Sequence, residues 1–266
     1  MAERTVGLLH PGDMGAAIGA TLRDEGARVL WASAGRSEET AARAAAGGLE
    51  DAGTVEALAK SSDVILSVCP PHAALEVARA VGDFAGTYVD ANAISPATAR
   101  AVAATVSRCV DGGIIGPPPV RLGSTRLYLS GPEAPLVAEL FERTTLDTRI
   151  VSDELGAASA VKMAYAAWTK GTAALLLAVR SLARVEGVES TLLEEWELSL
   201  PDLPARSIRA AEAAATKGWR WIGEMEEIAA TFAADDLPAG FHLAAADVFR
   251  AISDDLAEAW PRAVPN

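Results

Sequence analysis

A tight turn close to the first residue has the residue types that bind phosphate. An apolar run, Thr5 to Leu9, ends at His10-Pro11-Gly12-Asp13-Met14-Gly15, after which apolar residues recur at helical spacing. A strand, a turn and a helix in this order leave unpaired backbone N–H groups and the positive end of a helix dipole at the turn. Gly12 and Gly15 match the last two glycines of a G-x-G-x-x-G fingerprint, and His10 occupies the place of the first. The pattern predicts a pyrophosphate site; the alternative is an ordinary turn in which the glycines only permit close packing.

A lysine in an apolar stretch is a candidate for proton transfer. Lys162 is flanked by alanine, valine and methionine. Such surroundings desolvate the amine and lower its pKa towards the range useful for catalysis. Ser159 and Tyr165 lie three residues to either side, on the same face of a helix. Lys162 and Tyr165 are therefore candidate catalytic residues; the alternative is a structural lysine whose stem packs along small residues.

The segment after the second apolar run reads Ser33-Ala34-Gly35-Arg36-Ser37. Folds that bind NAD usually place an acidic residue here to accept hydrogen bonds from the ribose 2′-hydroxyl, and this segment has none. Ser33, Arg36 and Ser37 instead offer hydroxyls and a planar cationic fork, which suit a 2′-phosphate. The sequence therefore favours NADP over NAD. Ser37 can in addition cap the next helix.

Two further loops follow apolar runs and are expected at the same edge of a sheet. In Cys69-Pro70-Pro71 the prolines fix the backbone where it would pass the ribose and nicotinamide. Asn92 follows the run at Thr87–Asp90 and could hydrogen-bond to a cofactor or a substrate, while Ser95 and Pro96 begin the next helix. Both loops belong to the predicted cofactor site.

Short apolar runs alternate with alanine-rich helical stretches up to about residue 150. The expected strands are Thr5–Leu9, Arg28–Ala32, Val64–Val68, Thr87–Asp90, Cys109–Ile114 and Leu127–Ser130. The expected helices are 14–25, 37–46, 54–60, 72–81 and 96–106. Strands rich in Val, Ile and Leu between helices indicate an α/β domain over residues 1–152, with a doubly wound parallel sheet that binds ligands beyond the carboxyl ends of its strands.

Strand-like runs are absent after Glu154. One long helix is expected over Leu155–Val185, followed by helices near 190–200, 203–216, 218–234 and 241–258, with a break at Gly218. Residues 153–266 are thus expected to form an all-α domain for substrate binding and dimerisation. Its long alanine-rich helix needs a partner surface, which the second subunit of a homodimer could supply.

Composition narrows the possible partners. Half of the 266 residues are hydrophobic and 22% are charged, as in soluble globular proteins, and the net charge of −13 argues against nucleic acid or an anionic membrane as a partner. Cys69 and Cys109 lie in apolar runs and the three histidines do not cluster, so no metal site is expected. Neither a signal-peptide pattern nor an apolar stretch long enough for a membrane is present in the sequence. We expect a cytoplasmic protein with a small-molecule substrate.

The turn, the loops and Lys162 together resemble the β-hydroxyacid dehydrogenase and 6-phosphogluconate dehydrogenase superfamily over about the first 180 residues. Its members show a Gly-rich turn ending in Met-Gly, loops of the types Asp-x-Ser-Thr-x-x-Pro and Asp-Ala-Pro-Val-Ser-Gly-Gly, and a helix with G-x-G-x-x-x-K-x-x-x-N. The stretch Lys217–Ile228 is similar to a little-characterised, 6-phosphogluconate dehydrogenase-like branch. The resemblance implies a Rossmann domain followed by a helical domain, an NAD(P) cofactor and a homodimer.

By this resemblance Lys162 holds the position of the family's catalytic lysine, and three other positions differ. The asparagine four residues after the lysine is Ala166, so that Tyr165 would be the polar neighbour. The Ser-Gly-Gly that holds a substrate carboxylate is Ile115-Gly116-Pro117, and the Ser-Thr of the cofactor loop is Asn92-Ala93. An ordinary β-hydroxyacid is therefore not the expected substrate. Candidate substrate-binding residues are Ile115, Gly116, Pro117 and His242, with Arg121 and Arg220 as further candidates that surface ion pairs explain equally well.

We therefore expect an NADP-dependent oxidoreductase that transfers hydride between the nicotinamide and a small carbonyl or hydroxy compound, with Lys162 as general acid and base. The first alternative is an imine reductase. Such enzymes commonly have Asp or Tyr in place of the lysine, so Lys162 argues against this reading, while Tyr165 and Ile115 favour it. The second alternative is a dinucleotide-binding protein without activity, because both polar substrate contacts are lost. Architecture alone does not fix the reaction.

Overall fold

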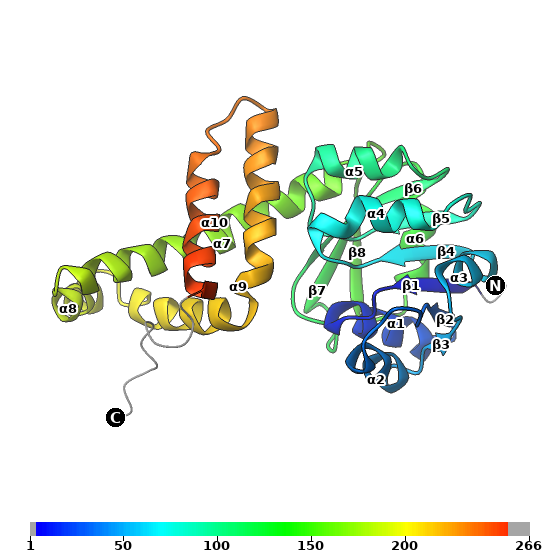
Figure 1. Ribbon diagram of the computed structural model, residues 1–266, viewed down its shortest axis with the longest axis horizontal. Helices are drawn as coiled ribbons and strands as arrows, with labels where there is room; N and C mark the ends of the chain where they lie inside the picture. Colours follow the sequence, from blue (N-terminus) through cyan, green and yellow to red (C-terminus); the bar gives the residue numbers. More distant parts are fainter. Residues whose placement is uncertain (1–3, 255–266) are drawn as a thin grey trace. The chain divides into compact units, whose positions relative to one another are not determined.

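The computed structural model describes residues 4–254 (Figure 1). One compact unit ends at Met163 and a second begins at Ala164. The first unit contains an eight-stranded sheet of order β3-β2-β1-β4-β5-β6-β7-β8. Its strands are β1 (Thr5–Leu9), β2 (Arg28–Trp31), β3 (Glu50–Asp51), β4 (Val64–Ser67), β5 (Thr87–Asp90), β6 (Cys109–Ile115), β7 (Thr125–Ser130) and β8 (Leu146–Ser152). Its helices are α1 (Asp13–Asp24), α2 (Glu38–Ala46), α3 (Val55–Ser61), η1 (Pro71–Ala73), α4 (Ala74–Ala80), α5 (Pro96–Ala103) and α6 (Ala134–Phe141).

The expected doubly wound sheet with covering helices is confirmed, but the last two strands, β7 and β8, run opposite to the expected parallel order. Strands β1 to β6 run parallel, whereas β7 is antiparallel to β6. The connection from Ile115 to Thr125 contains no helix, and a short connection of this kind joins antiparallel strands, since parallel neighbours need a crossover. The carboxyl ends of β1, β2, β4, β5 and β6 therefore lie at one edge of the sheet, with the reversal of strand order between β1 and β4.

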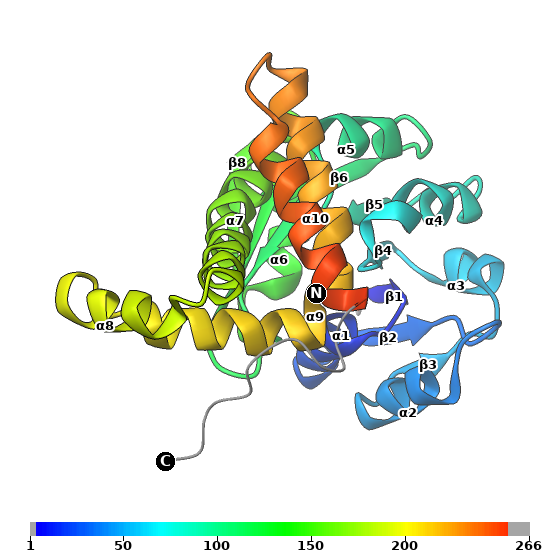
Figure 2. The same ribbon diagram turned by 60° about the vertical axis from the view of Figure 1, so that its left-hand side comes forward.

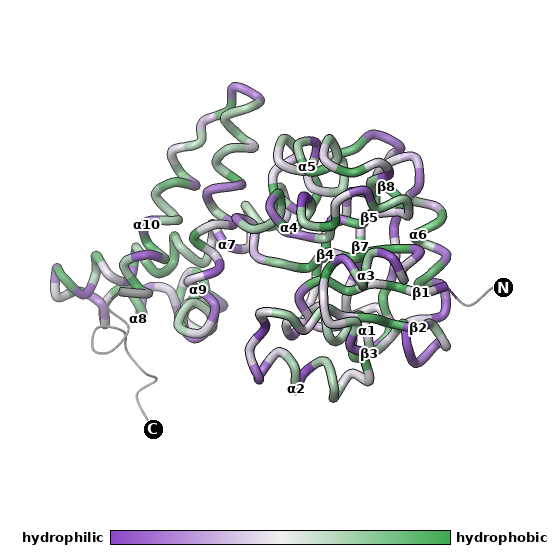
Figure 3. The backbone as a smooth tube through the Cα atoms, turned by 45° about the vertical axis from the view of Figure 1, so that its right-hand side comes forward, coloured by the Kyte–Doolittle hydropathy of each residue, from purple (hydrophilic) through white to green (hydrophobic). Residues whose placement is uncertain are grey.

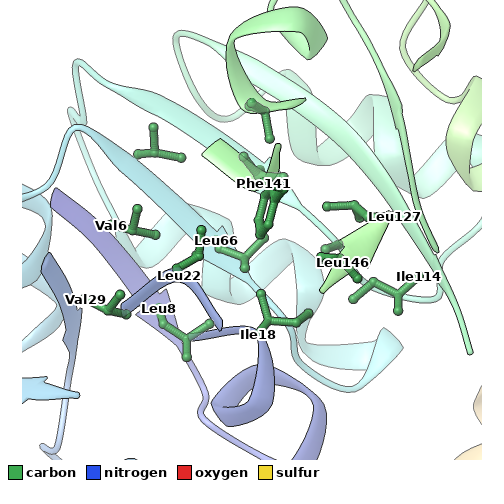
Figure 4. Packing of buried hydrophobic residues seen from close by; sticks show 14 of the residues in the cluster. Val6, Leu8, Ile18, Leu22, Val29, Leu66, Ile114, Leu127, Phe141 and Leu146 are labelled. Carbon is green, nitrogen blue, oxygen red and sulfur yellow. The ribbon is translucent and has the colours of Figure 1, made fainter. Parts of the chain in front are cut away.

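Apolar side chains fill both faces of this sheet. Successive strand residues point to opposite faces, so that Leu8 and Leu66 join one buried cluster and Leu9 and Ile65 the other. In the first cluster Ile18 of α1 packs among strand residues (Figure 4). Figure 3 shows hydrophobic residues concentrated along β1 and β4. Burial on both faces is the reason why these strands read as nearly continuous apolar runs.

Four buried polar residues interrupt the apolar sheet in a single row. Ser67 of β4 is in register with Asp90 of β5, Asp90 with Asp111 of β6, and Asp111 with Ser130 of β7. Each is at most 1% exposed. Buried polar groups require hydrogen-bond partners, and these four find them in the loops and the helix that follow the strands.

The second unit is helical, as expected. The helices are α7 (Ala157–Val185), which begins in the first unit, α8 (Glu189–Ser199), α9 (Leu203–Ala234) and α10 (Gly240–Asp254). Arg180 of α7 donates to Glu189 of α8 (2.6 and 3.0 Å) and to Ser207 of α9 (3.2 Å), which ties three helices together. The second half of α9 lies beside α10 (Figures 1 and 2), where the Trp221 and Phe249 rings meet at 5.1 Å.

Several expected boundaries were wrong. Strands β3 and β8 and helix α6 were not expected, and α9 is one helix rather than two. Gly218 is buried within α9 and does not break the helix. The helix does bend, where its colour passes from yellow to orange in Figure 1. The expected end of the last helix, 255–258, lies outside the described residues. No helix within 4–254 is long and apolar enough to cross a membrane.

Candidate cofactor and active site

The turn after β1 leaves the N-terminus of α1 open. Gly12 caps α1 without a side-chain hydrogen bond, and a Cβ placed on Gly12 would meet no atom within 4 Å. A Cβ on Gly15 would lie 2.8 Å from the carbonyl oxygen of His10. The two glycines of the turn therefore have different surroundings. Gly15 permits close packing, and Gly12 keeps the first N–H groups of α1 accessible to an anion.

An arginine that the sequence did not single out supports this turn. Arg43 of α2 donates from Nε to the carbonyl oxygen of Pro11 (3.4 Å), and its Nε lies 3.8 Å from the Asp13 carboxylate. The guanidinium therefore balances the negative charge of Asp13 beside the helix N-terminus. Met14 packs against the core of the sheet. The Arg43 hydrogen bond and the packing of Met14 thus both hold the turn in place.

The segment after β2 holds a buried, unsatisfied donor. Nε of Arg36 is buried and has no hydrogen-bond partner within residues 4–254, and burial lowers the pKa of the guanidinium. Ser37 accepts from the N–H of Thr40 (3.3 Å), which confirms the helix cap. Hydrogen bonds from the Gly53 N–H (2.7 Å) and the Ser33 side chain lower the pKa of the Asp51 carboxyl. Ser33 thus already has a partner, which the sequence did not indicate because Asp51 comes from β3.

His10, Arg36 and Cys69 come together from the ends of β1, β2 and β4. His10 has a left-handed backbone (φ 66°), which explains why the fingerprint has glycine at this place. Burial, together with the nearby charge of Arg36, lowers the pKa of His10 to about 4. Nδ1 of His10 is buried without a hydrogen-bond partner among the described residues. Burial raises the pKa of the Cys69 thiol to about 12, against a hydrogen bond from Ser67 and the Arg36 charge.

The side chain of Asn92 forms hydrogen bonds to the polar row of the sheet and to the loop after β4. Its Oδ1 accepts from the N–H of Cys69 (2.6 Å), and its Nδ2 donates to Ser67 (3.2 Å) and to Asp90 (3.0 Å). Asn92 is 2% exposed. Burial raises the pKa of Asp90 to about 7, while the Asn92 N–H groups oppose this shift. In this structure Asn92 fixes the Cys69-Pro70-Pro71 loop, and Pro71 begins the short helix η1.

A buried carboxylate anchors the helix that carries Lys162. Oδ2 of Asp111 accepts from the N–H groups of Gly156 (3.1 Å) and Ser159 (2.9 Å) and from the Ser130 hydroxyl (2.9 Å), and Oδ1 accepts from the Ser159 hydroxyl (2.6 Å). This is the capping of a helix N-terminus by a strand. The sequence signal was available, because a charged residue inside a buried strand requires partners.

Lys162 lies against the end of β6. Its Nζ donates to the carbonyl oxygen of Ile114 (2.8 Å), and the side chain is partly buried. A Cβ on Gly113 would lie 2.7 Å from the carbonyl oxygen of Ala158 and 3.0 Å from Cβ of Lys162, so glycine allows β6 and α7 to approach closely. Tyr165 follows Lys162 on α7 and is 48% exposed.

The expected substrate-binding residues occupy different surroundings. Ile115 is buried at the end of β6, Gly116 has a left-handed backbone (φ 131°), and the carbonyl oxygen of Pro117 accepts from the Thr125 hydroxyl. His242 belongs to α10 in the second unit.

The His242 ring is 6% exposed and lies 4.2 Å from the Phe232 ring. Burial lowers its pKa, and its Nδ1 has no hydrogen-bond partner among the described residues. Arg220 lies 5.6 Å from the Trp219 ring, and Arg121 is exposed.

These features fit a phosphate-bearing cofactor. The open space at Gly12, the unpaired Nε of Arg36 and the unpaired Nδ1 of His10 lie at one edge of the sheet, where an anion would satisfy them. The residues within 4–254 include no group of three or more His, Cys, Asp or Glu side chains that could hold a metal ion.

Residues 5–93 match a family model described as "NADP oxidoreductase coenzyme F420-dependent", and residues 183–252 match the domain of unknown function DUF1932. An uncharacterized 28.5 kDa protein from the 7S RNA 5′ region of Methanothermus fervidus is 30% identical over 195 residues, which cover 72% of this chain and 76% of that protein. A conserved protein of unknown function, described as structurally similar to 3-hydroxyacid dehydrogenases, is 28% identical, with a TM-score of 0.71 over 94% of this chain and 97% of that one.

A reductive aminase from Aspergillus terreus in complex with NADPH and ethyl levulinate is 20% identical, with a TM-score of 0.60 over 96% of this chain and 95% of that one. At this identity the likeness concerns the fold. Together with the fold, the comparisons show that the chain belongs to the β-hydroxyacid dehydrogenase and 6-phosphogluconate dehydrogenase-like superfamily of NAD(P)-dependent oxidoreductases.

Proposed function

We propose that this chain is an NADP-dependent oxidoreductase that transfers hydride between the nicotinamide and a small carbonyl or hydroxy compound, with Lys162 as general acid and base. The observation that carries the proposal is the position of Lys162. Its amine is held by Ile114 at the carboxyl end of β6, the edge of the sheet at which the His10–Met14 turn and Arg36 also lie. One edge thus offers both an anion site and a proton donor.

The cofactor would lie along the loops after β1, β2, β4 and β5. The N–H groups beside Gly12 suit the pyrophosphate, and Arg36 with Ser33 and Ser37 suits a 2′-phosphate. The remaining candidate contacts are His10, Pro11, Asp13, Met14, Cys69, Pro70, Pro71 and Asn92. When bound, NADPH supplies a hydride to the substrate carbon. Because Asn92 is engaged with Asp90 and Ser67, we assign it the role of holding the Cys69 loop in place.

Lys162 would move the proton. Its ammonium group donates a proton to the carbonyl oxygen of the substrate, and the neutral amine remains held by the carbonyl of Ile114. In the reverse direction the amine removes the hydroxyl proton. Asp111 positions this lysine by fixing the first turn of α7. Tyr165, one helical turn further, is the proposed second polar group.

The substrate is proposed to be less polar than a common β-hydroxyacid. The buried side chain of Ile115 and the backbone of Gly116 and Pro117 offer no hydroxyl to a carboxylate. His242 would act as a neutral donor or acceptor, since burial lowers its pKa.

An imine substrate is the second candidate, supported by Tyr165 and Ile115. A binding protein without activity is the third, supported by the missing polar contacts.

A panel of substrates separates these functions. NADPH consumption is measured with small ketones and aldehydes, hydroxyacids in the reverse direction, and cyclic imines. Turnover of carbonyl or hydroxy compounds that is lost in Lys162→Met supports the proposal. Turnover of cyclic imines alone would replace it by imine reduction, and NADPH binding without turnover of any compound would favour the third candidate.

We further propose a cytoplasmic homodimer, with residues 1–152 as the nucleotide-binding domain and 153–266 as the domain for substrate binding and dimerisation. The support is an exposed apolar stripe on α7. Trp168, Leu175 and Leu182 are 67%, 50% and 62% exposed and recur every seven residues, the spacing of a helix-to-helix seam. A second copy of the chain would cover this stripe.

A further inference from the structure

The second unit contains a cavity of about 370 Å³ between α7 and α9. Its polar lining includes Thr172 and Lys170 of α7 and Arg206 and Arg209 of α9. Its apolar lining includes Leu176 and Trp221. The cavity therefore combines cationic groups with an aromatic wall, a composition suited to a ligand with a charged end and an apolar body.

The charges in this cavity are unequally compensated. Lys170 forms an ion pair with Glu224 at 2.6 Å, and both side chains are largely buried (12% and 15% exposed). Arg206 and Arg209 form no ion pair with any residue in the part of the chain that the structure describes, residues 4–254. The two guanidinium groups are three residues apart on one helix and repel each other. An anion between them would remove this repulsion and receive paired hydrogen bonds.

We propose that this cavity binds a small organic anion, a carboxylate or phosphate monoester with an aromatic or other apolar body. The anionic oxygens lie on Arg206 and Arg209, and the apolar body lies against Trp221 and Leu176. An excess of positive charge at this place stands out in a chain of net charge −13 and concentrates anions locally. The proposal is independent of the oxidoreductase function, because every lining residue belongs to the second unit.

Isothermal titration calorimetry of the full chain without nucleotide tests the proposal with four probes: phenyl phosphate, benzoate, inorganic phosphate and benzyl alcohol. We expect phenyl phosphate or benzoate to bind more tightly than inorganic phosphate, which lacks the apolar body, and than benzyl alcohol, which lacks the charge. The tighter of the two aromatic anions identifies the acidic group. Arg206→Gln and Arg209→Gln are each expected to weaken binding about tenfold or more.

Lys217→Gln serves as the matched control. Lys217 is an exposed cation on the same helix and does not line the cavity, so its replacement is expected to leave the Kd unchanged. Circular dichroism confirms that the variants fold. The proposal is overturned if neither aromatic anion binds, or if the arginine variants bind as tightly as the control. The double variant Arg206→Glu with Arg209→Glu tests whether a second copy of the chain covers the cavity instead. The proposal is likewise overturned if this variant changes the oligomeric state and the wild type binds no probe.

Discussion

Replacing Asp111 with alanine tests whether the buried carboxylate fixes α7 to the sheet. The change leaves the N–H groups of Gly156 and Ser159 without an acceptor, together with the hydroxyls of Ser130 and Ser159. The hydroxyls can rotate towards other partners, whereas the two buried N–H groups cannot. An unpaired buried N–H costs about 1–3 kcal/mol, so the free energy of unfolding is expected to fall by about 2–6 kcal/mol.

The asparagine variant provides the sharper comparison. In Asp111→Asn one oxygen can still accept from both N–H groups, and the new amide can donate to the Ser159 hydroxyl. Only the contribution of the negative charge is lost, about 1–2 kcal/mol. Urea unfolding followed by circular dichroism gives the free energies. Asp147→Ala is the control, because its partner Arg149 is exposed and a surface pair contributes about 0–1 kcal/mol.

Two results would show that the hydrogen bonds to Asp111 do not fix α7 in this way. One is an Asp111→Ala variant that is no less stable than Asp147→Ala, which would mean that other groups hold the first turn of α7. The other is an asparagine variant as unstable as the alanine variant, because then the charge rather than the hydrogen-bond acceptor would be the important property.

Three further predictions concern single positions. The folded-state pKa of His10, about 4, lies below the ordinary value of 6.5, so the unfolded state binds the proton first as the pH falls. Between pH 6.5 and pH 4 the free energy of unfolding of the wild type is expected to fall by about 1–2 kcal/mol relative to that of His10→Asn. Unfolding measured at each pH tests this, and parallel curves for the two proteins would contradict it. Lys162→Met is expected to reduce kcat at least about 100-fold in steady-state assays while leaving the Kd of NADPH unchanged, and full turnover would remove the assigned role. Trp168→Glu with Leu175→Glu is expected to convert a dimer to a monomer by light scattering, whereas a wild-type monomer would disprove the dimer.

Much of the sheet was predictable because its strands are apolar runs closed by glycine, proline or capping residues. β1 and β5 have the expected bounds, and Ser95 and Ser37 cap helices as expected. β8 was missed because it lies at the sheet margin and is mostly exposed or half-buried, and its sequence, Leu-Asp-Thr-Arg-Ile-Val-Ser, is neither a continuous apolar run nor a regular alternation.

The site was predictable only in part. Its loops follow directly from neighbouring residues in the sequence, whereas the side chains that hold these loops and α7 in place come from distant parts of the sequence. The open turn at Gly12 follows from the order strand, turn, helix. That Arg43 would hold this turn, or that Asp111 would cap α7 from 45 residues away, depends on packing between elements. The hydrogen bonds of Asn92 to Ser67 and Asp90 were likewise not predictable, because the register that places Ser67 beside Asp90 exists only in the folded sheet.

The dissociation constants of NADPH and NADH show whether the proposed site at the Gly12 turn and Arg36 binds NADP in preference to NAD. Fluorescence titration of the wild type is expected to give NADPH the lower Kd by about 10-fold to 100-fold, the effect of hydrogen bonds to a charged group. Arg36→Ala should abolish this difference, while Arg79→Ala on the exposed side of α4 should preserve it. Equal affinities in the wild type, or a preference that survives Arg36→Ala, would mean that this site does not select NADP through Arg36.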